Sequence, residues 1–183
     1  IGGPSVMPYQ PEGLWQEVSG KVYEQDHGEA LYRRSLYTYW KRTVAPPMMV
    51  TFDATSREAC MVNRSRTNTP LQALALMNGV TFVEAARNLA QQELLRSAAS
   101  VDQRMVRMFR IVTSRKPSAV ETQILVRRYA ASLKEYKQQP QAAAELVAIG
   151  DTAADPNLDV AELAALTTVG CVLLNLDEVI TKE

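Results

Sequence analysis

The sequence has little of what metal centres and redox sites are built from. Its 183 residues include one histidine, His27, and two cysteines, Cys60 and Cys171, with no Cys-x-x-Cys and no haem-attachment motif. A histidine-rich metal site within this chain is therefore excluded, and no cofactor of its own is predicted. A carboxylate-only metal site would need neither residue type, but no ligand spacing favours one. The spacing of Cys60 and Cys171 leaves open whether they form a disulfide or stay two thiols.

Excess charge and long hydrophobic runs are also missing. The chain carries 20 Lys and Arg against 20 Asp and Glu, so its formal net charge is zero. Because the chain has no net positive charge to attract phosphate groups, no nucleic-acid partner is predicted. No apolar run reaches the ~18–20 residues that span a bilayer, so no membrane span is predicted. No Gly-rich loop precedes a Lys-Ser/Thr pair, which removes a P-loop phosphate site.

Strand alternation is absent over any useful length, apart from a short extended piece expected at Val50-Thr51-Phe52. Residues 1–28 contain many glycines and prolines, which predicts a loop-rich segment wrapped over a core. Helical spacing then dominates the rest of the chain. The expected helices cover 29–43, a short stretch near 56–60, 70–77, 80–97, the residues after Ser100, 118–138, the residues from Pro140 to Gly150, and 159–174.

This pattern predicts a mainly α fold, an irregular orthogonal bundle of about six to eight helices behind a long loop-rich N-terminal segment. Residues 1–183 are expected to form one helical domain. Capping patterns mark the helix starts at Ser100, Ser118 and Asp159. The last helix is apolar on most of its sides between Leu163 and Leu174, so it is expected to be the central, buried helix.

A polar run just before a helix start is the best place to look for function. Thr69 suits the N-cap position and Pro70 the first helical position, where free N–H groups favour an anion or an acceptor oxygen. The candidate ligand-binding residues of this run are Arg64, Arg66, Asn68 and Gln72. The favoured alternative is structural: these side chains tie the loop down, with Arg66 paired to Asp177 or Glu178.

Two further groups of residues could carry chemistry. In Asp26-His27-Gly28-Glu29 a histidine lies between carboxylates, as a general base would, although Asp26 or His27 capping the next helix is the favoured alternative. The aromatic run 32–40 is interleaved with arginines such as Arg33, a pattern that stacks on sugars or bases but more often forms a core stripe. Asp26, His27 and Arg33 therefore join the candidate binding residues. No residue is assigned as catalytic or as a metal ligand.

Several long strings of this sequence resemble the planctomycete-specific C-terminal domain of unknown function. They are residues 2–6, 8–15, 31–43, 66–74, 82–87 and 173–178. That domain closes large exported proteins that often carry a cytochrome-c-like N-terminal module. The resemblance implies a location in the periplasm or cell envelope, and a haem, if any, in an upstream domain. It implies no activity. Family members normally carry more helical sequence before the 2–6 string, so the chain is expected to be a C-terminal piece of a larger protein.

Two functional hypotheses follow. The first is a non-catalytic helical docking domain of a multidomain envelope protein, whose partners are the upstream domains of its own protein or an envelope glycan or protein. The second is an accessory domain of a polysaccharide-acting hydrolase or redox enzyme, with a cleft around Asp26, His27 and Arg66. A cleft that gathers these three side chains would favour the second hypothesis.

Overall fold

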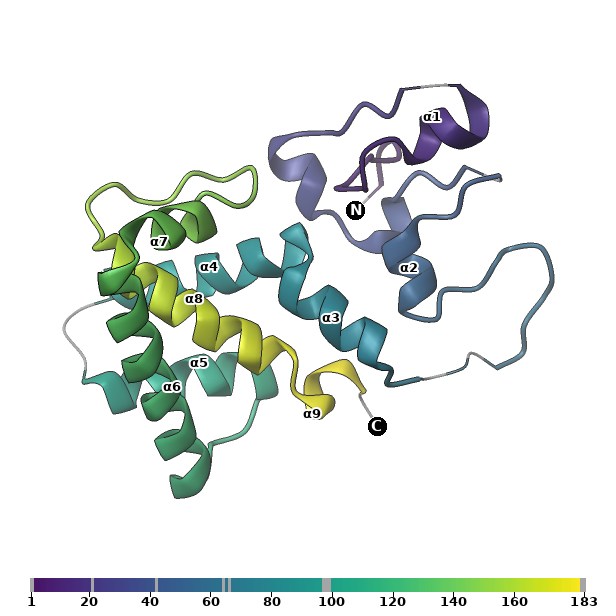
Figure 1. Ribbon diagram of the computed structural model, residues 1–183. Helices are drawn as coiled ribbons and strands as arrows, with labels where there is room; N and C mark the ends of the chain where they lie inside the picture. The colour runs from purple at the N-terminus through teal and green to yellow at the C-terminus, as the bar shows by residue number, and fades with distance from the viewer. Residues whose placement is uncertain are drawn as a thin grey trace. The chain divides into compact units, whose positions relative to one another are not determined.

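A computed structural model of the chain describes residues 2–20, 22–41, 43–63, 65, 67–96 and 100–181 (Figure 1). These residues form helices joined by loops and contain no strand, which confirms the mainly α prediction. The chain divides into two compact units, residues 1–72 and 73–183. That residues 1–183 form one domain stays a prediction. None of the described helices is long and apolar enough to cross a membrane.

The first unit consists mostly of loops, with short helical pieces between them. These pieces are α1 (Leu14–Ser19), the 3₁₀ turns η1 (Gly28–Tyr32) and η2 (Ser35–Tyr37), α2 (Pro47–Thr51) and the start of α3 (Pro70–Asn78). Glycines in the left-handed backbone region bound α1, with Gly13 at φ 79 and Gly20 at φ 64. Pro47 opens α2 at a position where a missing N–H costs nothing.

The predicted helix over 29–43 is wrong, because the backbone there pairs with the N-terminal segment instead. Val6 donates its N–H to the Tyr37 carbonyl at 2.8 Å, and the Val6 carbonyl accepts from the Tyr39 N–H at 2.8 Å. This parallel bridge between Val6 and Thr38 occupies groups that a helix would need. Two other local predictions are also wrong: residues 50–51 lie in α2 instead of an extended piece, and residues 56–60 form no helix.

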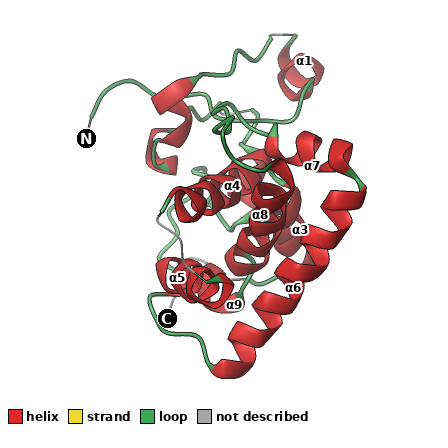
Figure 2. Cartoon of the chain, turned by 90° about the vertical axis from the view of Figure 1, so that its left-hand side faces the viewer, coloured by secondary structure: helices red, strands yellow, loops and turns green. Residues whose placement is uncertain are grey.

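The second unit is a helical bundle built around one central helix. After the rest of α3 it contains α4 (Val80–Leu95), α5 (Val101–Thr113), α6 (Ala119–Gln138), α7 (Pro140–Val147), α8 (Val160–Leu174) and α9 (Asp177–Ile180). Helices α4, α6 and α7 pack against α8, which Figures 1 and 2 show from two sides. Leu166, Val169 and Leu173 on α8 have no exposed surface, so the expected central position of this helix is confirmed.

Local chemistry fixes the helix starts and one close helix contact. Ser100 and Gln103, and likewise Ser118 and Glu121, exchange the two hydrogen bonds of a capping box, as predicted. Where α8 meets α4, a Cβ added to Gly170 would lie 3.0 Å from the Ala86 Cβ, so a larger residue at 170 would require α4 to shift by a few tenths of an ångström.

Two glutamates of α4 are buried and paired with arginines, which helical periodicity did not predict. Glu84 and Arg87 are each 1% exposed, with Arg87 Nη2 at 3.4 Å from Glu84 Oε1. Arg87 also donates to the Val147 carbonyl at 3.0 Å, and the Thr152 N–H donates to Glu84 at 2.7 Å. Glu93 has no exposed surface and binds Arg107 at 2.6 Å.

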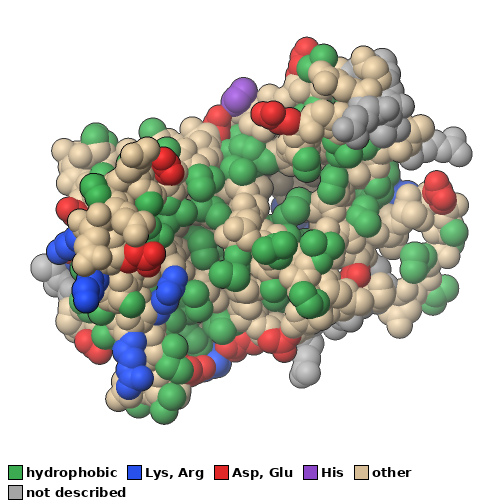
Figure 3. Space-filling view, viewed as in Figure 1, with side chains coloured by type: hydrophobic (Ala, Val, Ile, Leu, Met, Phe, Trp, Pro, Cys, Tyr) green, Lys and Arg blue, Asp and Glu red, His purple; other side chains and the backbone are tan. Residues whose placement is uncertain are grey.

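Exposed cations gather on the outer surface of this bundle. On the face seen in Figure 3, most Lys and Arg side chains gather over the region of α6. The exposed cations of α6 are Arg127, Arg128, Lys134 and Lys137. Their position away from the core is what the solvated face of an amphipathic helix requires.

Candidate functional site

The polar run before α3 is occupied by a capping box. Gln72 Oε1 accepts from the Thr69 N–H at 2.9 Å, and Thr69 Oγ1 accepts from the Gln72 N–H at 3.3 Å, which confirms Thr69 as the N-cap. The Gln72 side-chain amide also donates to the Thr51 carbonyl at 2.9 Å and to the Thr67 hydroxyl oxygen at 3.0 Å. Gln72 is 1% exposed, so its amide serves the protein's own loop.

Asp53 completes this loop, and the sequence analysis missed it. Its carboxylate accepts the Thr67 N–H and the Thr67 hydroxyl, each at 2.8 Å. Asp53 lies just after α2 in the left-handed region with φ 58, where the Ala54 N–H bonds back to the Met49 carbonyl. Such helix ends favour Gly, then Asn or Asp. The sequence feature that could have indicated Asp53 is therefore an acidic residue shortly after a helix that begins with proline.

The other candidates of the polar run are less defined. Arg64 and Arg66 lie outside the described residues, so the pairing of Arg66 with a C-terminal carboxylate stays a prediction. Asn68 is exposed. Of the two carboxylates proposed for Arg66, Glu178 binds Arg115 through contacts of 2.7 and 2.8 Å.

Asp26 and Arg33 bind the N-terminal segment whose Val6 pairs with 37–39, and His27 follows Asp26 in the sequence. Asp26 Oδ2 accepts the Met7 N–H at 2.6 Å. His27 is exposed and occupies the N-cap position of η1, with Glu29 in the first turn, so the capping alternative is right in position; the His27 side chain makes no capping hydrogen bond. Arg33 donates to the Pro4 carbonyl at 2.7 Å and to the Gly2 carbonyl. These contacts use Asp26 and Arg33 as ties within the unit.

Arg33 also explains the glycines near the start of the chain. Its guanidinium carbon lies 3.7 Å from the centroid of the Tyr37 ring, and the Tyr37 hydroxyl accepts the Gly2 N–H at 2.9 Å. Gly3 has φ 94, and a Cβ there would lie 3.4 Å from Arg33 Nη1. Glycine permits both this backbone conformation and this close approach.

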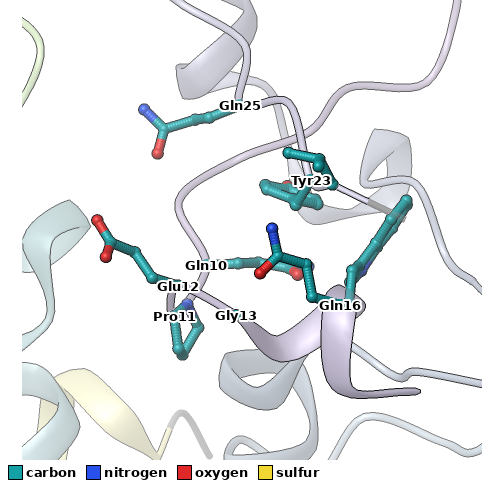
Figure 4. A pocket seen from close by; sticks show the side chains of 9 residues that line it. Gln10, Pro11, Glu12, Gly13, Gln16, Tyr23 and Gln25 are labelled. Carbon is teal, nitrogen blue, oxygen red and sulfur yellow. The ribbon is translucent and has the colours of Figure 1, made fainter. Parts of the chain in front are cut away.

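A surface pocket of about 590 Å³ lies beside α1, and sequence reasoning did not single it out as a site. We call it the α1 pocket. Its lining residues come from the loop before α1, from α1 and from the segment that follows: Gln10, Pro11, Glu12, Gly13, Trp15, Gln16, Val22, Tyr23 and Gln25. Figure 4 shows Tyr23 and Gln25 along one edge and Pro11 and Gly13 along the opposite edge. The density of glutamine and aromatic residues in 9–16 was the pattern that could have indicated it.

The aromatic wall of the α1 pocket is held rigidly. Trp15 is 7% exposed, and its ring packs edge-on against Tyr23 with centroids 5.0 Å apart. Lys41 Nζ lies 4.5 Å from the Trp15 ring centroid. The Tyr23 hydroxyl donates to the Pro8 carbonyl at 2.5 Å. Burial, together with the nearby Asp26 carboxylate, raises the pKa of Tyr23 well above its usual value, so this hydroxyl stays protonated.

The polar groups of the α1 pocket are amides with one carboxylate. Gln10, Gln16 and Gln25 each offer a donor and an acceptor, and Glu12 is the charged side chain among the lining residues that the structure describes. Gln10 Oε1 is buried and accepts no hydrogen bond within the described protein.

Metal and thiol chemistry receive no support from the described residues. Nowhere in the described ranges do three or more His, Cys, Asp or Glu side chains come close enough to hold a metal ion. Cys60 is an exposed free thiol and Cys171 a buried one. Burial raises the pKa of Cys171 to about 11, which keeps it protonated and unreactive at neutral pH.

Comparison with known proteins gives a family but no activity. The model of the family described as "Protein of unknown function (DUF1553)", also called PSD1, matches residues 1–129, which include the whole α1 pocket. No curated protein and no solved structure matched the chain. The matched stretch is most of the chain, and the chain therefore belongs to the DUF1553 family, a family of proteins of unknown function.

Proposed function

We propose that this chain is a non-catalytic binding domain that holds a saccharide in the α1 pocket. The observation that carries this proposal is the lining itself: three glutamine amides lie beside the Trp15–Tyr23 aromatic pair. Its volume of about 590 Å³ falls within the usual size of small-molecule sites.

The chemistry of the lining favours sugars over other polar ligands. Sugar hydroxyls both donate and accept hydrogen bonds, and one glutamine side chain can do the same through its amide oxygen and its NH₂ group. Tyr23, which is half-buried against Trp15, offers part of its ring to the C–H groups of a sugar. Glu12, the charged side chain among the described lining residues, disfavours uronates and sulfate esters. The expected ligand is therefore a neutral sugar or an amino sugar.

The same lining supports binding rather than hydrolysis. Glycosidases generally place two carboxyl groups on either side of the bond they cleave. Glu12 is the one carboxylate among the described residues that line this pocket. The nearby Asp26 carboxylate accepts the Met7 N–H, which engages it in holding the N-terminal segment. A hydrolase or redox role with a cleft around Asp26, His27 and Arg66 stays the alternative hypothesis.

Within a larger exported protein, such a pocket would attach the upstream domains to an envelope glycan. This setting follows from the resemblance to planctomycete proteins, and a haem, where present, would belong to an upstream domain. The helical second unit would then serve as a stable support. An envelope location agrees with the proposed ligand, because neutral and amino-sugar polymers are cell-wall material.

The direct test is calorimetric titration of the chain with cellopentaose and chitopentaose, with pentagalacturonate as the acidic control. Gln16→Ala and Gln10→Ala should each weaken binding of the preferred neutral or amino-sugar probe about tenfold, the effect of one lost hydrogen bond. Glu24→Ala is the matched control, because Glu24 is exposed in the same segment but does not line the pocket. It should leave affinity unchanged.

Circular dichroism and melting temperature establish that each variant is folded. The proposal fails if neither neutral probe binds at millimolar concentration, or if Gln10→Ala and Gln16→Ala bind as well as the unaltered chain. It also fails if pentagalacturonate binds more tightly than both other probes, because Glu12 should repel it.

A further inference from the structure

A second pocket in the first unit has a different chemistry from the α1 pocket. Its volume is about 400 Å³, and we call it the Trp40 pocket. It is formed by η2, by α2 and by the residues after each of them: Ser35, Leu36, Trp40, Met49, Phe52, Ala54, Thr55 and Arg57. It shares no lining residue with the α1 pocket. Its walls are mainly apolar, whereas amides dominate the other.

Arg57 gives the Trp40 pocket a fixed positive charge. Its guanidinium carbon lies 4.6 Å from the centroid of the Trp40 ring. Stacking on an aromatic face restrains the guanidinium plane while its N–H groups stay directed outward along the edge. No carboxylate in the described part of the chain forms an ion pair with Arg57. The cation is thus held in place and available to an external anion.

Leu36 shows that apolar surface beside this cation is accessible. Its side chain is 76% exposed, and it lines the same pocket as the half-buried Trp40 and Phe52. An exposed leucine next to aromatic side chains is surface that a ligand's apolar group would cover. The charge and the apolar walls belong to one small cavity, so the ligand must carry both features within about one residue's length.

We propose that the Trp40 pocket binds the C-terminal residue of a polypeptide that ends in an apolar side chain. The terminal carboxylate pairs with the Arg57 guanidinium, and the adjacent side chain lies against Trp40, Phe52 and Leu36. A carboxylate accepts two parallel N–H bonds from a guanidinium, a geometry that an ammonium group cannot offer. This assignment rests on contacts separate from those of the α1 pocket and does not depend on saccharide binding.

A chain end fits better than an internal acidic residue. In a C-terminal leucine the carboxylate and the side chain leave the same Cα, so both reach one small cavity. An internal Glu or Asp carries its carboxylate on a side chain, with the nearest apolar side chain on another residue. Pairing with the terminal carboxylate therefore also selects the end of the partner chain.

The test compares the peptide N-acetyl-Ala-Ala-Leu as the free acid with the same peptide as its C-terminal amide, titrated into the whole chain. The free acid should bind about tenfold to a hundredfold more tightly, as expected for charge-assisted hydrogen bonds to one guanidinium. Arg57→Ala should remove this difference, and Arg57→Lys should restore only part of it. Arg128→Ala, an equal loss of charge on exposed α6, should change nothing.

Leu36→Asp is a second variant that does not depend on the fold around Arg57. Because Leu36 is exposed, the change should leave the melting temperature unaltered while repelling the free acid. Equal binding of acid and amide, or an undiminished difference in Arg57→Ala, overturns the proposal. N-acetyl-leucine that binds as tightly as the peptide overturns it too, because the pocket would then select a small carboxylic acid instead of a chain end.

Discussion

Different interactions stabilise each of the two units. In the second unit, α8 lies among other helices and its side chains from Leu163 to Leu173 form much of the core. In the first unit, side chains tie backbone segments together: Arg33 holds Pro4, Asp26 holds Met7 and Gln72 holds Thr51. In the first unit, the α1 and Trp40 pockets lie between loop segments that these side-chain contacts hold.

On the proposed function, this difference would give the two units distinct tasks. The α1 and Trp40 pockets belong wholly to the first unit, and both proposed ligands contact loop residues held by these ties. Binding residues on loops over a rigid framework are common in proteins. Both tryptophans, Trp15 and Trp40, lie in the first unit, so their fluorescence reports on it alone.

The largest expected effect is the loss of the buried ion pair in the second unit. Glu84→Ala should lower the free energy of unfolding by about 3–5 kcal/mol, because it leaves the Arg87 charge buried without its partner. Urea denaturation followed by far-ultraviolet circular dichroism measures it. The double variant Glu84→Leu/Arg87→Leu should cost less than Glu84→Ala. A double variant that is no better would show that the pair itself does not matter.

Leu173→Ala tests the apolar core directly. Leu173 on α8 has no exposed surface, so the change should cost about 2–5 kcal/mol through lost burial and a cavity. Ile124→Ala is the matched control, because Ile124 is 56% exposed on α6 and should change stability by less than about 0.5 kcal/mol. Similar losses in both variants would contradict the central position of α8.

Gln72→Ala tests the ties of the first unit. The change removes one half of the capping box and the bond to Thr51, so it should cost about 0.5–2 kcal/mol. Tryptophan fluorescence during urea denaturation follows this unit. Gln138→Ala, at the exposed end of α6, provides the control. No shift of the fluorescence transition in Gln72→Ala would mean that the capping box is not a stabilising tie.

The smallest expected effect lies in an exposed ion-pair cluster of the second unit. Arg115 binds Glu121 at 2.6 Å and Glu178 at 2.7 Å. The Arg115 guanidinium lowers the pKa of Glu121 from 4.5 to about 2. A lowered folded-state pKa means that this stabilisation is present above pH 4.5 and is lost as pH falls toward 2. The pKa of Glu178 is lowered for the same reason.

Glu121→Gln isolates this contribution, because glutamine keeps the capping box with Ser118. The unaltered chain should be slightly more stable than the variant at pH 6, and the difference should shrink below pH 4.5 and in high salt. Parallel loss of stability in both proteins across this range would show that the cluster contributes nothing.

The features that could be predicted from sequence are local ones. The capping boxes at Ser100 and Ser118 depend on residues three positions apart, and the burial of α8 follows from its lack of polar residues. The helix predicted over 29–43 failed because a partner more than thirty residues away, Val6, uses the same backbone groups. The spacing of apolar residues within a segment does not reveal that a distant segment will bind its backbone groups.

The candidate site was harder to predict for the same reason. Gln72 and Arg33 were identified as candidates, but whether each serves a ligand or the loop depends on distant acceptors such as Thr51 and Pro4. The α1 pocket joins residues 10–16 with 22–25, and the burial of Gln10 Oε1 follows only from their packing. Glutamine is common on surfaces, so its presence alone does not indicate a site.

The proposal is that the first unit binds the saccharide and that the second unit takes no part in binding. Hydrogen exchange of the intact chain, with and without whichever of cellopentaose and chitopentaose binds, tests it most directly. Exchange should be slowest in α4 and α8, and adding the sugar should not change it there. Only amides within 10–25 should exchange more slowly when the sugar is present. Sugar-dependent protection confined to α4 and α8, or no protection at 10–25 under saturating sugar, would contradict it.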